Sequence, residues 1–342
     1  MFFLLKSNLS KALNLFSSVA SLYVPAENGQ LCSFVLYKPG IEVLLSKNTN
    51  FGPKAILLPQ TEIIYRYKNY GKDSQITPED VGLEKIIIFG LRSCDMQAIE
   101  CLDDVFLTQT TQKEAQDSRY RARRESTTTI ALGCTQPGVD CFCQSMAVDP
   151  SEHIKADLQL FDAEEFWEIK AHTLNGENLI QLLEKTGLVT VRDVESVQKK
   201  PLRDFSVAVD TDGLTTKLQK MFEHPIWDSL AKKCLNCGAC TYVCPTCHCF
   251  DISMRCQDAC QGSEIRYWDS CMFTQYSQMA GGHNPRPGKK ERVRQRFLHK
   301  LEFFPERYSK FLCTGCGRCL AVCPVNLDIT EVIKQIKEAD IR

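Results

Sequence analysis

The chain has 342 residues, of which 44% are hydrophobic and 24% charged, as in ordinary globular proteins. Its formal net charge of −1 excludes a strong electrostatic bias toward nucleic acid or an anionic membrane. The 19 cysteines are unusual in a chain that is long enough to build its core without a disulfide framework. This cysteine content favours metal ligation in a reducing compartment.

The first residues do not have the pattern of a secretory signal. Only residues 2–5 form an apolar run before Lys6, and residues 7–22 predict an amphipathic helix. No apolar run reaches the length of about eighteen residues that a membrane-spanning helix needs. We therefore expect a cytoplasmic protein without a membrane span.

Residues 1–220 predict an α/β domain. Residues 55–58 are a short apolar run ended by Pro59, and residues 85–90 (KIIIFG) predict a buried strand. The strand leads to Cys94 at the start of a predicted helix that continues to Phe106. Residues 127–132 (TTTIAL) predict a second strand, which leads to Cys134. Residues 157–194 alternate between short strand and helix patterns, and the pattern is interrupted at 200–228.

The strongest motif lies in residues 221–342. The pattern Cys-x2-Cys-x2-Cys-x3-Cys-Pro occurs twice, at Cys234, Cys237, Cys240 and Cys244 and again at Cys313, Cys316, Cys319 and Cys323. In two-cluster ferredoxins the fourth cysteine of such a motif binds the other 4Fe-4S cluster. We therefore expect Cys323 to complete the first site and Cys244 to complete the second.

Zinc is the main alternative for these cysteines. Structural zinc sites typically use two separate Cys-x2-Cys pairs, and two full copies of the longer motif make zinc improbable. The insert between the copies, residues 245–312, is too long for a compact bacterial ferredoxin and contains helical patterns. The sequence thus predicts an α+β protein, with an α/β domain followed by a helical two-cluster ferredoxin-like domain over residues 221–342.

A further set of cysteines lies in the first domain: Cys94, Cys134, Cys141 and Cys143. Neighbouring strand ends of an α/β sheet meet at the edge where ligands bind, and a helix amino terminus stabilises a thiolate. The alternative is that these residues pack as small hydrophobic side chains. We favour ligation of a third 4Fe-4S cluster.

Other features of the sequence have less specific interpretations. We expect Cys32 and Cys101 to be core residues. Packing is also favoured, over cluster tuning or substitution as ligands, for Cys247, Cys249, Cys256, Cys260 and Cys271. Residues 289–304 predict a helix with one apolar face and one basic face. A solvated basic face is favoured over a docking patch for an acidic electron carrier.

The chain resembles a known family of 4Fe-4S dicluster subunits, which includes the sulfhydrogenase β subunit together with the corresponding iron–sulfur subunit of anaerobic sulfite reductase. The resemblance covers nearly the whole chain. The segments that carry it are 58–67 (LPQTEIIYRY), 90–106 (GLRSCDMQAIECLDDVF), 122–146 (ARRESTTTIALGCTQPGVDCFCQSM), 244–252 (CPTCHCFDI) and 266–287 (RYWDSCMFTQYSQMAGGHNPRP). It implies an electron-relay subunit of anaerobic metabolism between a flavin or NAD(P) subunit, or ferredoxin, and a catalytic subunit.

These patterns together predict an iron–sulfur subunit of a multisubunit oxidoreductase, hydrogenase-like or sulfite-reductase-like. The sequence has no GxGxxG after a strand and no P-loop, and we expect no substrate site on this chain. One alternative is a self-sufficient reductase with flavin in the first domain, because flavin can bind without that fingerprint. Another is a structural metal or interaction module.

Overall fold

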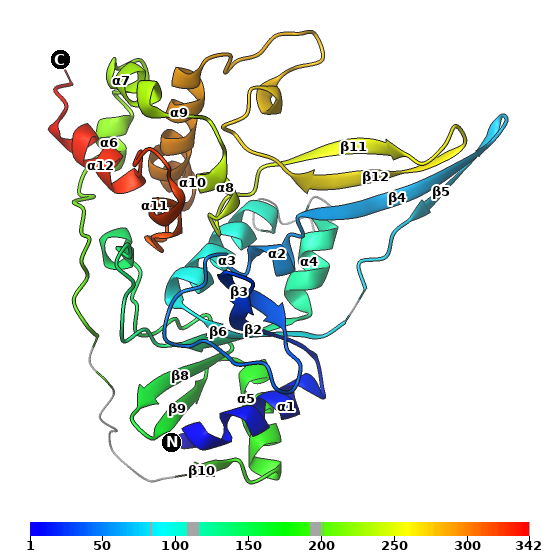
Figure 1. Ribbon diagram of the computed structural model, residues 1–342, viewed down its shortest axis with the longest axis vertical. Helices are drawn as coiled ribbons and strands as arrows, with labels where there is room; N and C mark the ends of the chain where they lie inside the picture. The colour runs from blue at the N-terminus through cyan, green and yellow to red at the C-terminus, as the bar shows by residue number, and fades with distance from the viewer. Residues whose placement is uncertain (83, 108–115, 192–199, 201, 342) are drawn as a thin grey trace.

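An eight-stranded mixed sheet forms the amino-terminal part of the molecule (Figure 1). The computed structural model describes residues 1–82, 84–107, 116–191, 200 and 202–341. The strand order is β10 (Val189–Val191), β1 (Phe2–Leu5), β9 (Phe166–Ala171), β8 (Leu158–Ala163), β7 (Thr127–Leu132), β6 (Ile86–Leu91), β2 (Ser21–Asn28) and β3 (Leu31–Leu36). The four strands β8, β7, β6 and β2 are parallel, and the others are antiparallel to their neighbours.

Helices cover both faces of this sheet. On one face, α1 (Leu9–Ser17) and α5 (Leu174–Lys185) pack against Ile87 and Phe89 of β6. On the other face, α2 (Lys54–Leu57), α3 (Ser93–Phe106) and α4 (Ser118–Glu125) pack against Ile88 and Leu91. Burial on both faces explains why β6 is an uninterrupted apolar run. The predicted strands at 85–90 and 127–132 are confirmed as β6 and β7, which pair in parallel.

The helix predicted over residues 7–22 is too long. A short 3-10 helix occupies Lys6–Asn8, and α1 ends at Ser17. Ser21 already begins β2, where Leu22 is 1% exposed and contributes to the core beneath α1. Pairing with β6 therefore takes residues from 21 onward out of the helical pattern.

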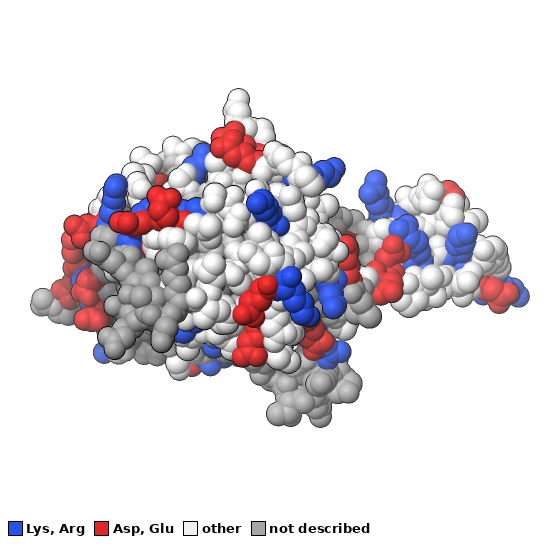
Figure 2. Space-filling view, turned by 90° about the horizontal axis from the view of Figure 1, so that it is seen from below, with Lys and Arg blue, Asp and Glu red and all other residues white. Residues whose placement is uncertain are grey.

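A four-stranded antiparallel sheet projects from the body of the molecule, and we call it the arm (Figure 1). Its order is β11 (Phe250–Cys256), β12 (Gln261–Trp268), β4 (Thr61–Tyr70) and β5 (Asp73–Pro78). The hairpin β11–β12 lies in the insert where the sequence indicated helices. Basic and acidic side chains are interspersed on the arm, as Figure 2 shows from below.

Helices make up most of the carboxy-terminal part, and the predicted α+β class is confirmed. They are α6 (Leu214–Leu218), α7 (Ile226–Lys233), α8 (Ala239–Tyr242), α9 (Lys289–Leu298), α10 (Phe304–Tyr308), α11 (Arg318–Val322) and α12 (Ile329–Glu338). A π-helical turn, His299–Phe303, joins α9 to α10, and short 3-10 helices occupy Cys143–Met146 and Gln275–Ser277. No helix in the described part of the chain is long and apolar enough to cross a membrane.

The core of this helical part includes residues from the first domain. Phe142 belongs to the same buried cluster as Trp227, Phe297 and Ile333. The arm likewise joins strands from both sides of residue 220. The division of the chain into domains at residue 220 therefore stays a prediction.

The helix predicted over 289–304 is present, but only part of its basic face is a solvated surface. Val293, Phe297, Leu301 and Phe304 are buried, as the apolar pattern indicated. Arg292, Arg296 and Lys300 are also buried, with 6%, 5% and 5% of their surface exposed. The expectation fails because Arg296 and Lys300 face the cysteine motifs, while Arg292 donates to the carbonyls of Arg286 and Pro287.

Candidate iron–sulfur sites

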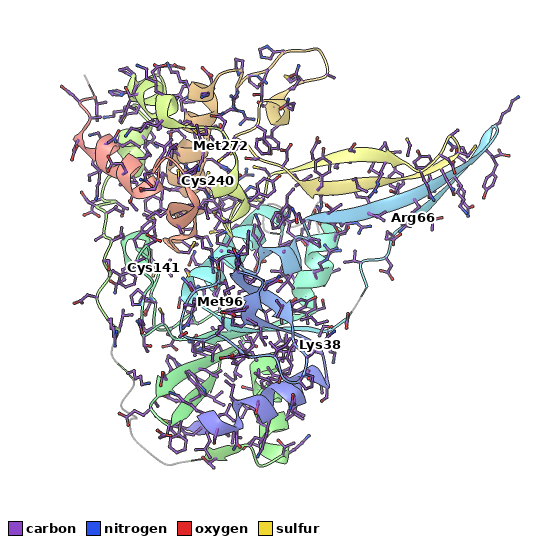
Figure 3. The ribbon with its side chains drawn as sticks, in the orientation of Figure 1. Lys38, Arg66, Met96, Cys141, Cys240 and Met272 are labelled. Carbon is purple, nitrogen blue, oxygen red and sulfur yellow. The ribbon has the colours of Figure 1, made fainter. Side chains whose placement is uncertain are left out.

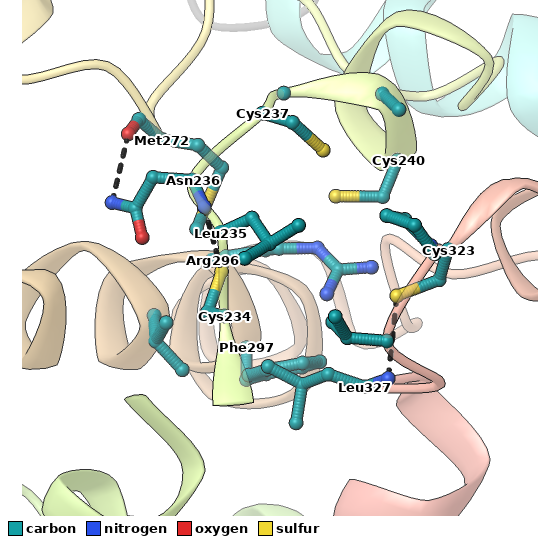
Figure 4. A pocket seen from close by; sticks show the side chains of 15 residues that line it. Cys234, Leu235, Asn236, Cys237, Cys240, Met272, Arg296, Phe297, Cys323 and Leu327 are labelled. Atoms are coloured by element: carbon teal, nitrogen blue, oxygen red, sulfur yellow. Dashed lines mark hydrogen bonds between the residues drawn. The ribbon is translucent and has the colours of Figure 1, made fainter. Parts of the chain in front are cut away.

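The first site is a pocket lined by Cys234, Cys237, Cys240 and Cys323. Cys234 and Cys237 lie in the loop before α8, Cys240 lies at the start of α8, and Cys323 follows α11. In Figure 4 the sulfur atoms of Cys237, Cys240 and Cys323 are turned toward one another. The structure thus brings Cys323 to the first copy of the motif, although it belongs to the second copy in sequence.

The two copies of the motif fold into the same loop. Asn236 and Gly238 have φ of 56° and 75°, and the equivalent Gly315 and Gly317 have 63° and 77°. These positive φ values turn the backbone around the site and aim N–H groups at the sulfurs. Asn236 N donates to Cys234 Sγ at 3.3 Å, and Leu327 N donates to Cys323 Sγ at 3.2 Å. Such hydrogen bonds help to set the potential of a cluster.

The second site brings Cys244 together with Cys313, Cys316 and Cys319. Thr246 Oγ1 lies 3.2 Å from Cys244 Sγ and donates to Leu312 O at 2.6 Å, which places Cys244 beside the start of the second motif. Burial raises the pKa of Cys313 to about 12 and raises the pKa values of Cys316 and Cys319 as well. These thiols would therefore keep their protons at neutral pH unless a metal displaced them.

Cys244 has a different environment from its three partners. A hydrogen bond from Cys247 holds the pKa of Cys244 well below its usual range, against the opposing effect of burial. The hydroxyl of Thr246 lies 3.2 Å from Cys244 Sγ, and Lys300 Nζ donates to the same sulfur at 3.4 Å. These contacts favour a thiolate, the form that ligates iron.

Two members of the third set of predicted ligands, Cys94 and Cys143, belong to the same buried cluster. Parallel pairing of β6 and β7 places Cys94 and Cys134 beyond adjacent strand ends. Cys143 interacts electrostatically with Cys94, Cys134 and Cys141. Burial raises the pKa of Cys143 to about 12 and that of Cys94 well above its usual value. The expected stabilisation of a Cys94 thiolate by the helix terminus is therefore outweighed by desolvation.

The second and third sites are in direct contact. Phe142 N donates to Gly315 O at 2.8 Å, and Cys141 Sγ lies 3.8 Å from Cys316 O. A Cβ at Gly315 would lie 2.5 Å from Cys143 Cα, and one at Gly317 would lie 2.5 Å from Asp140 O. Only glycine allows the two loops to approach this closely. The position of Cys141 on the body and of Cys240 in the helical part can be followed in Figure 3.

An ion pair lies at the same junction. Arg318 Nη1 is 2.7 Å from Asp95 Oδ1, and both side chains are almost fully buried, at 3% and 2% exposure. Arg318 also donates to the carbonyl and the hydroxyl of Thr49 at 2.7 and 2.9 Å. Arg318 and Asp95 act electrostatically on Cys94 and Cys316 with opposite signs. The pair therefore contributes little net charge to either site.

The thiol donors of the cysteine groups are those that hold iron–sulfur clusters. In the described residues, no three His, Cys, Asp or Glu side chains converge closely enough to hold one ion. The first group instead surrounds a cavity, and its donors are thiols that ligate iron in clusters. The second group is also buried, and not every cation beside it has an acidic partner among the described residues. An anionic cluster would supply the missing negative charge.

The remaining cysteines divide into three groups. Cys32 and Cys101 are confirmed as core residues, at 1% and 0% exposure. The predicted packing role is wrong for Cys256 and Cys260. Both are exposed on the arm, at the end of β11 and just before β12. Cys247, Cys249 and Cys271 are partly buried, and a hydrogen bond from Cys271 lowers the pKa of Cys249 to about 6.

Sequence reasoning missed Arg296 and Lys300 as residues of the sites. Arg296 lines the first cavity, and Lys300 contacts Cys244. Together with Arg292 they are spaced by four residues, which places the three on one stripe of a helix. A basic stripe beside two cysteine motifs is the signal that could have located them.

Residues 233–327 match the family model of the 4Fe-4S dicluster domain. These residues, which hold both copies of the cysteine motif, are therefore similar to a 4Fe-4S dicluster domain. It is also similar to sulfhydrogenase 2 subunit beta of Pyrococcus furiosus, with 28% identity over 330 residues, which are 95% of each chain. The predicted resemblance to the dicluster subunits of the sulfhydrogenase β type is confirmed.

Proposed function

We propose that this chain relays electrons through three 4Fe-4S clusters, two in the dicluster domain and one in the sheet domain. The observation that carries the proposal is the pocket lined by Cys234, Cys237, Cys240 and Cys323. Its four thiols come from both copies of the motif, as the exchange of the fourth ligand requires. Cys244 would complete the second cluster in the same way.

The third cluster would be held by Cys94, Cys134, Cys141 and Cys143. The mutual influence of their thiols supports a common site, and the contact of Cys141 with Cys316 O favours a position beside the second one. Clusters supply one-electron transfer when bound, and the protein side chains hold them and exclude water. We assign no acid–base step to any residue of this chain.

The partners would be oxidoreductase subunits. The similar protein is named as a subunit of a sulfhydrogenase, which favours a complex with other oxidoreductase subunits. We propose a catalytic subunit and a flavin or NAD(P) subunit, with ferredoxin as another donor, as the family resemblance implies. Because 4Fe-4S clusters persist in reducing surroundings, we place the chain in the cytoplasm of an anaerobically metabolising cell.

Absorption spectroscopy of the anaerobically purified chain tests this function. We expect a broad visible absorption that dithionite bleaches, together with electron paramagnetic resonance signals of reduced clusters. A structured band like that of free flavin would instead support a flavin-containing reductase. A colourless protein would refute the electron-transfer function.

A further inference from the structure

Lys300 is a buried cation in contact with a predicted cluster ligand. Its Nζ donates to Cys244 Sγ at 3.4 Å, to Thr246 Oγ1 at 3.0 Å and to Leu312 O at 3.4 Å. The residue is 5% exposed. The π-helical turn His299–Phe303 holds it in this position.

Arg296 lies one helical turn before Lys300 and faces the first site of the dicluster domain. It lines the first cavity, where Figure 4 shows its guanidinium extending toward the space between the sulfurs. It also acts electrostatically on Cys240 of the first site and on Cys319 of the second. Its Nε has no hydrogen-bond partner among the described residues.

Neither cation has a carboxylate partner in the part of the chain that the structure describes. Arg318, beside the second and third sites, differs from them because Asp95 neutralises it at 2.7 Å. A buried charge without a counter-charge is costly. The thiolates and the anionic cluster they would hold are the counter-charge available to Arg296 and Lys300.

We propose that Arg296 and Lys300 are positioning residues that raise the reduction potentials of the two clusters in the dicluster domain. The proposal rests on the proposed function, because it requires clusters at these cysteines. Reduction adds one electron, supplied by a flavin or iron–sulfur partner, and makes a cluster more negative by one charge without forming or breaking a bond. A fixed cation nearby stabilises that form more than the oxidised one.

The two cations should differ in reach. Lys300 contacts the second site through Cys244, and it should act mainly on that cluster. Arg296 lines the pocket of the first site, and its charge also favours a thiolate at Cys319 of the second site, so it should act on both clusters and most strongly on the first. The third site is next to the neutralised Arg318–Asp95 pair, and we expect its cluster to have the lowest potential of the three.

A redox titration of the holoprotein, followed by electron paramagnetic resonance, tests the proposal. We expect Lys300→Gln to shift one midpoint potential to a more negative value and Arg296→Gln to shift two. Lys300→Arg and Arg296→Lys keep the positive charge, and their midpoint potentials should stay closer to those of the wild type. Lys290→Gln removes a charge from the exposed side of the same helix, where Lys290 pairs with Asp228, and should leave every midpoint unchanged.

Iron content separates the outcomes. A wild-type protein without iron would refute the proposed function itself, whereas unchanged midpoints in Lys300→Gln and Arg296→Gln proteins with full iron would overturn only the tuning role. If the Lys300→Gln protein loses a cluster, the Lys300→Arg protein serves as the decisive variant. Full iron content in Lys300→Arg would show that the site needs the positive charge. Loss of iron from Lys300→Arg as well would show that the shape of the side chain matters, and would overturn the proposal.

Discussion

At the scale of single residues, the arrangement depends on which cysteine reaches which cavity. Cys323 follows the second loop in sequence but lines the cavity of the first loop. Its sulfur accepts a hydrogen bond from Leu327 N at 3.2 Å, which fixes its direction. The spacing of the motif was sufficient to predict this exchange, because the fourth position lies beyond the loop that wraps its own cluster.

Replacing Cys323 by Ser should damage the first cluster and spare the second. The reason is that serine oxygen is a poorer ligand for iron than thiolate. The matched variants are Cys237→Ser, at the first site, and Cys316→Ser, at the second. We expect the electron paramagnetic resonance spectrum of Cys323→Ser to match that of Cys237→Ser. A match to Cys316→Ser instead would show that the fourth ligands are not exchanged.

Replacing Gly317 by Ala should destabilise the protein. Its φ is 77°, and an added Cβ would lie 2.5 Å from Asp140 O. Backbone strain of this kind costs roughly 1–3 kcal/mol, before any displacement of the loop that carries Cys141. Gly281→Ala is the control, because an added Cβ there meets nothing within 4 Å. Denaturant unfolding of the anaerobic protein measures the stability of both variants. Equal unfolding midpoints for Gly317→Ala and Gly281→Ala would contradict the close contact of the loops.

At the scale of elements, α9 and the π-helical turn connect the sites to the core. The apolar stripe of this segment was predictable from its spacing, and so were β6 and β7 from their uninterrupted apolar runs. The arm was not predictable, because β11 and β12 have burial patterns that are mostly exposed or intermediate. In addition, β12 pairs with β4, which is far away in sequence. The buried basic stripe was missed because charged side chains on a helix are ordinarily exposed to solvent.

Glu302, in the π-helical turn, should make stability depend on pH. It is 7% exposed, its Oε2 has no hydrogen-bond partner among the described residues, and burial raises its pKa from 4.5 to about 7. The folded state therefore holds a proton that the unfolded state releases, and this contribution to stability is lost as pH rises from about 4.5 to about 7.

The variant Glu302→Gln removes this dependence. Its free energy of unfolding should exceed that of the wild type increasingly as pH rises from about 5 to about 7.5, because only the wild type must ionise a buried carboxyl. Denaturant titrations at several pH values measure the difference. A difference that does not change with pH would contradict the raised pKa.

At the scale of the whole molecule, the two parts of the chain meet at the cysteines. The loop of Cys141 and Cys143 packs on the second motif, and the arm combines strands from both sides of residue 220. The sequence suggested candidate ligands for each site but not the contact between the sites. That contact depends on glycine positions in one loop and on backbone atoms in another. The spacing of apolar residues in the sequence carries no information about such contacts.

Replacing Cys141 by Ser in the full chain should remove or distort only the third cluster. The dicluster domain keeps its own eight cysteines, so its two clusters should retain their spectra. Cys32→Ser is a control for the loss of a buried thiol elsewhere in the same domain, where Cys32 is 1% exposed. A Cys141→Ser protein with the same iron content and spectra as the wild type would show that this set of cysteines is structural.

The iron and sulfide content of the anaerobically purified chain tests the account most directly. Three clusters predict about twelve iron and about twelve sulfide per chain. A content of about eight would confirm the dicluster domain and refute the third site. A content of about four or less would contradict the assignment of two clusters to the repeated motif, and with it the relay proposed for this protein.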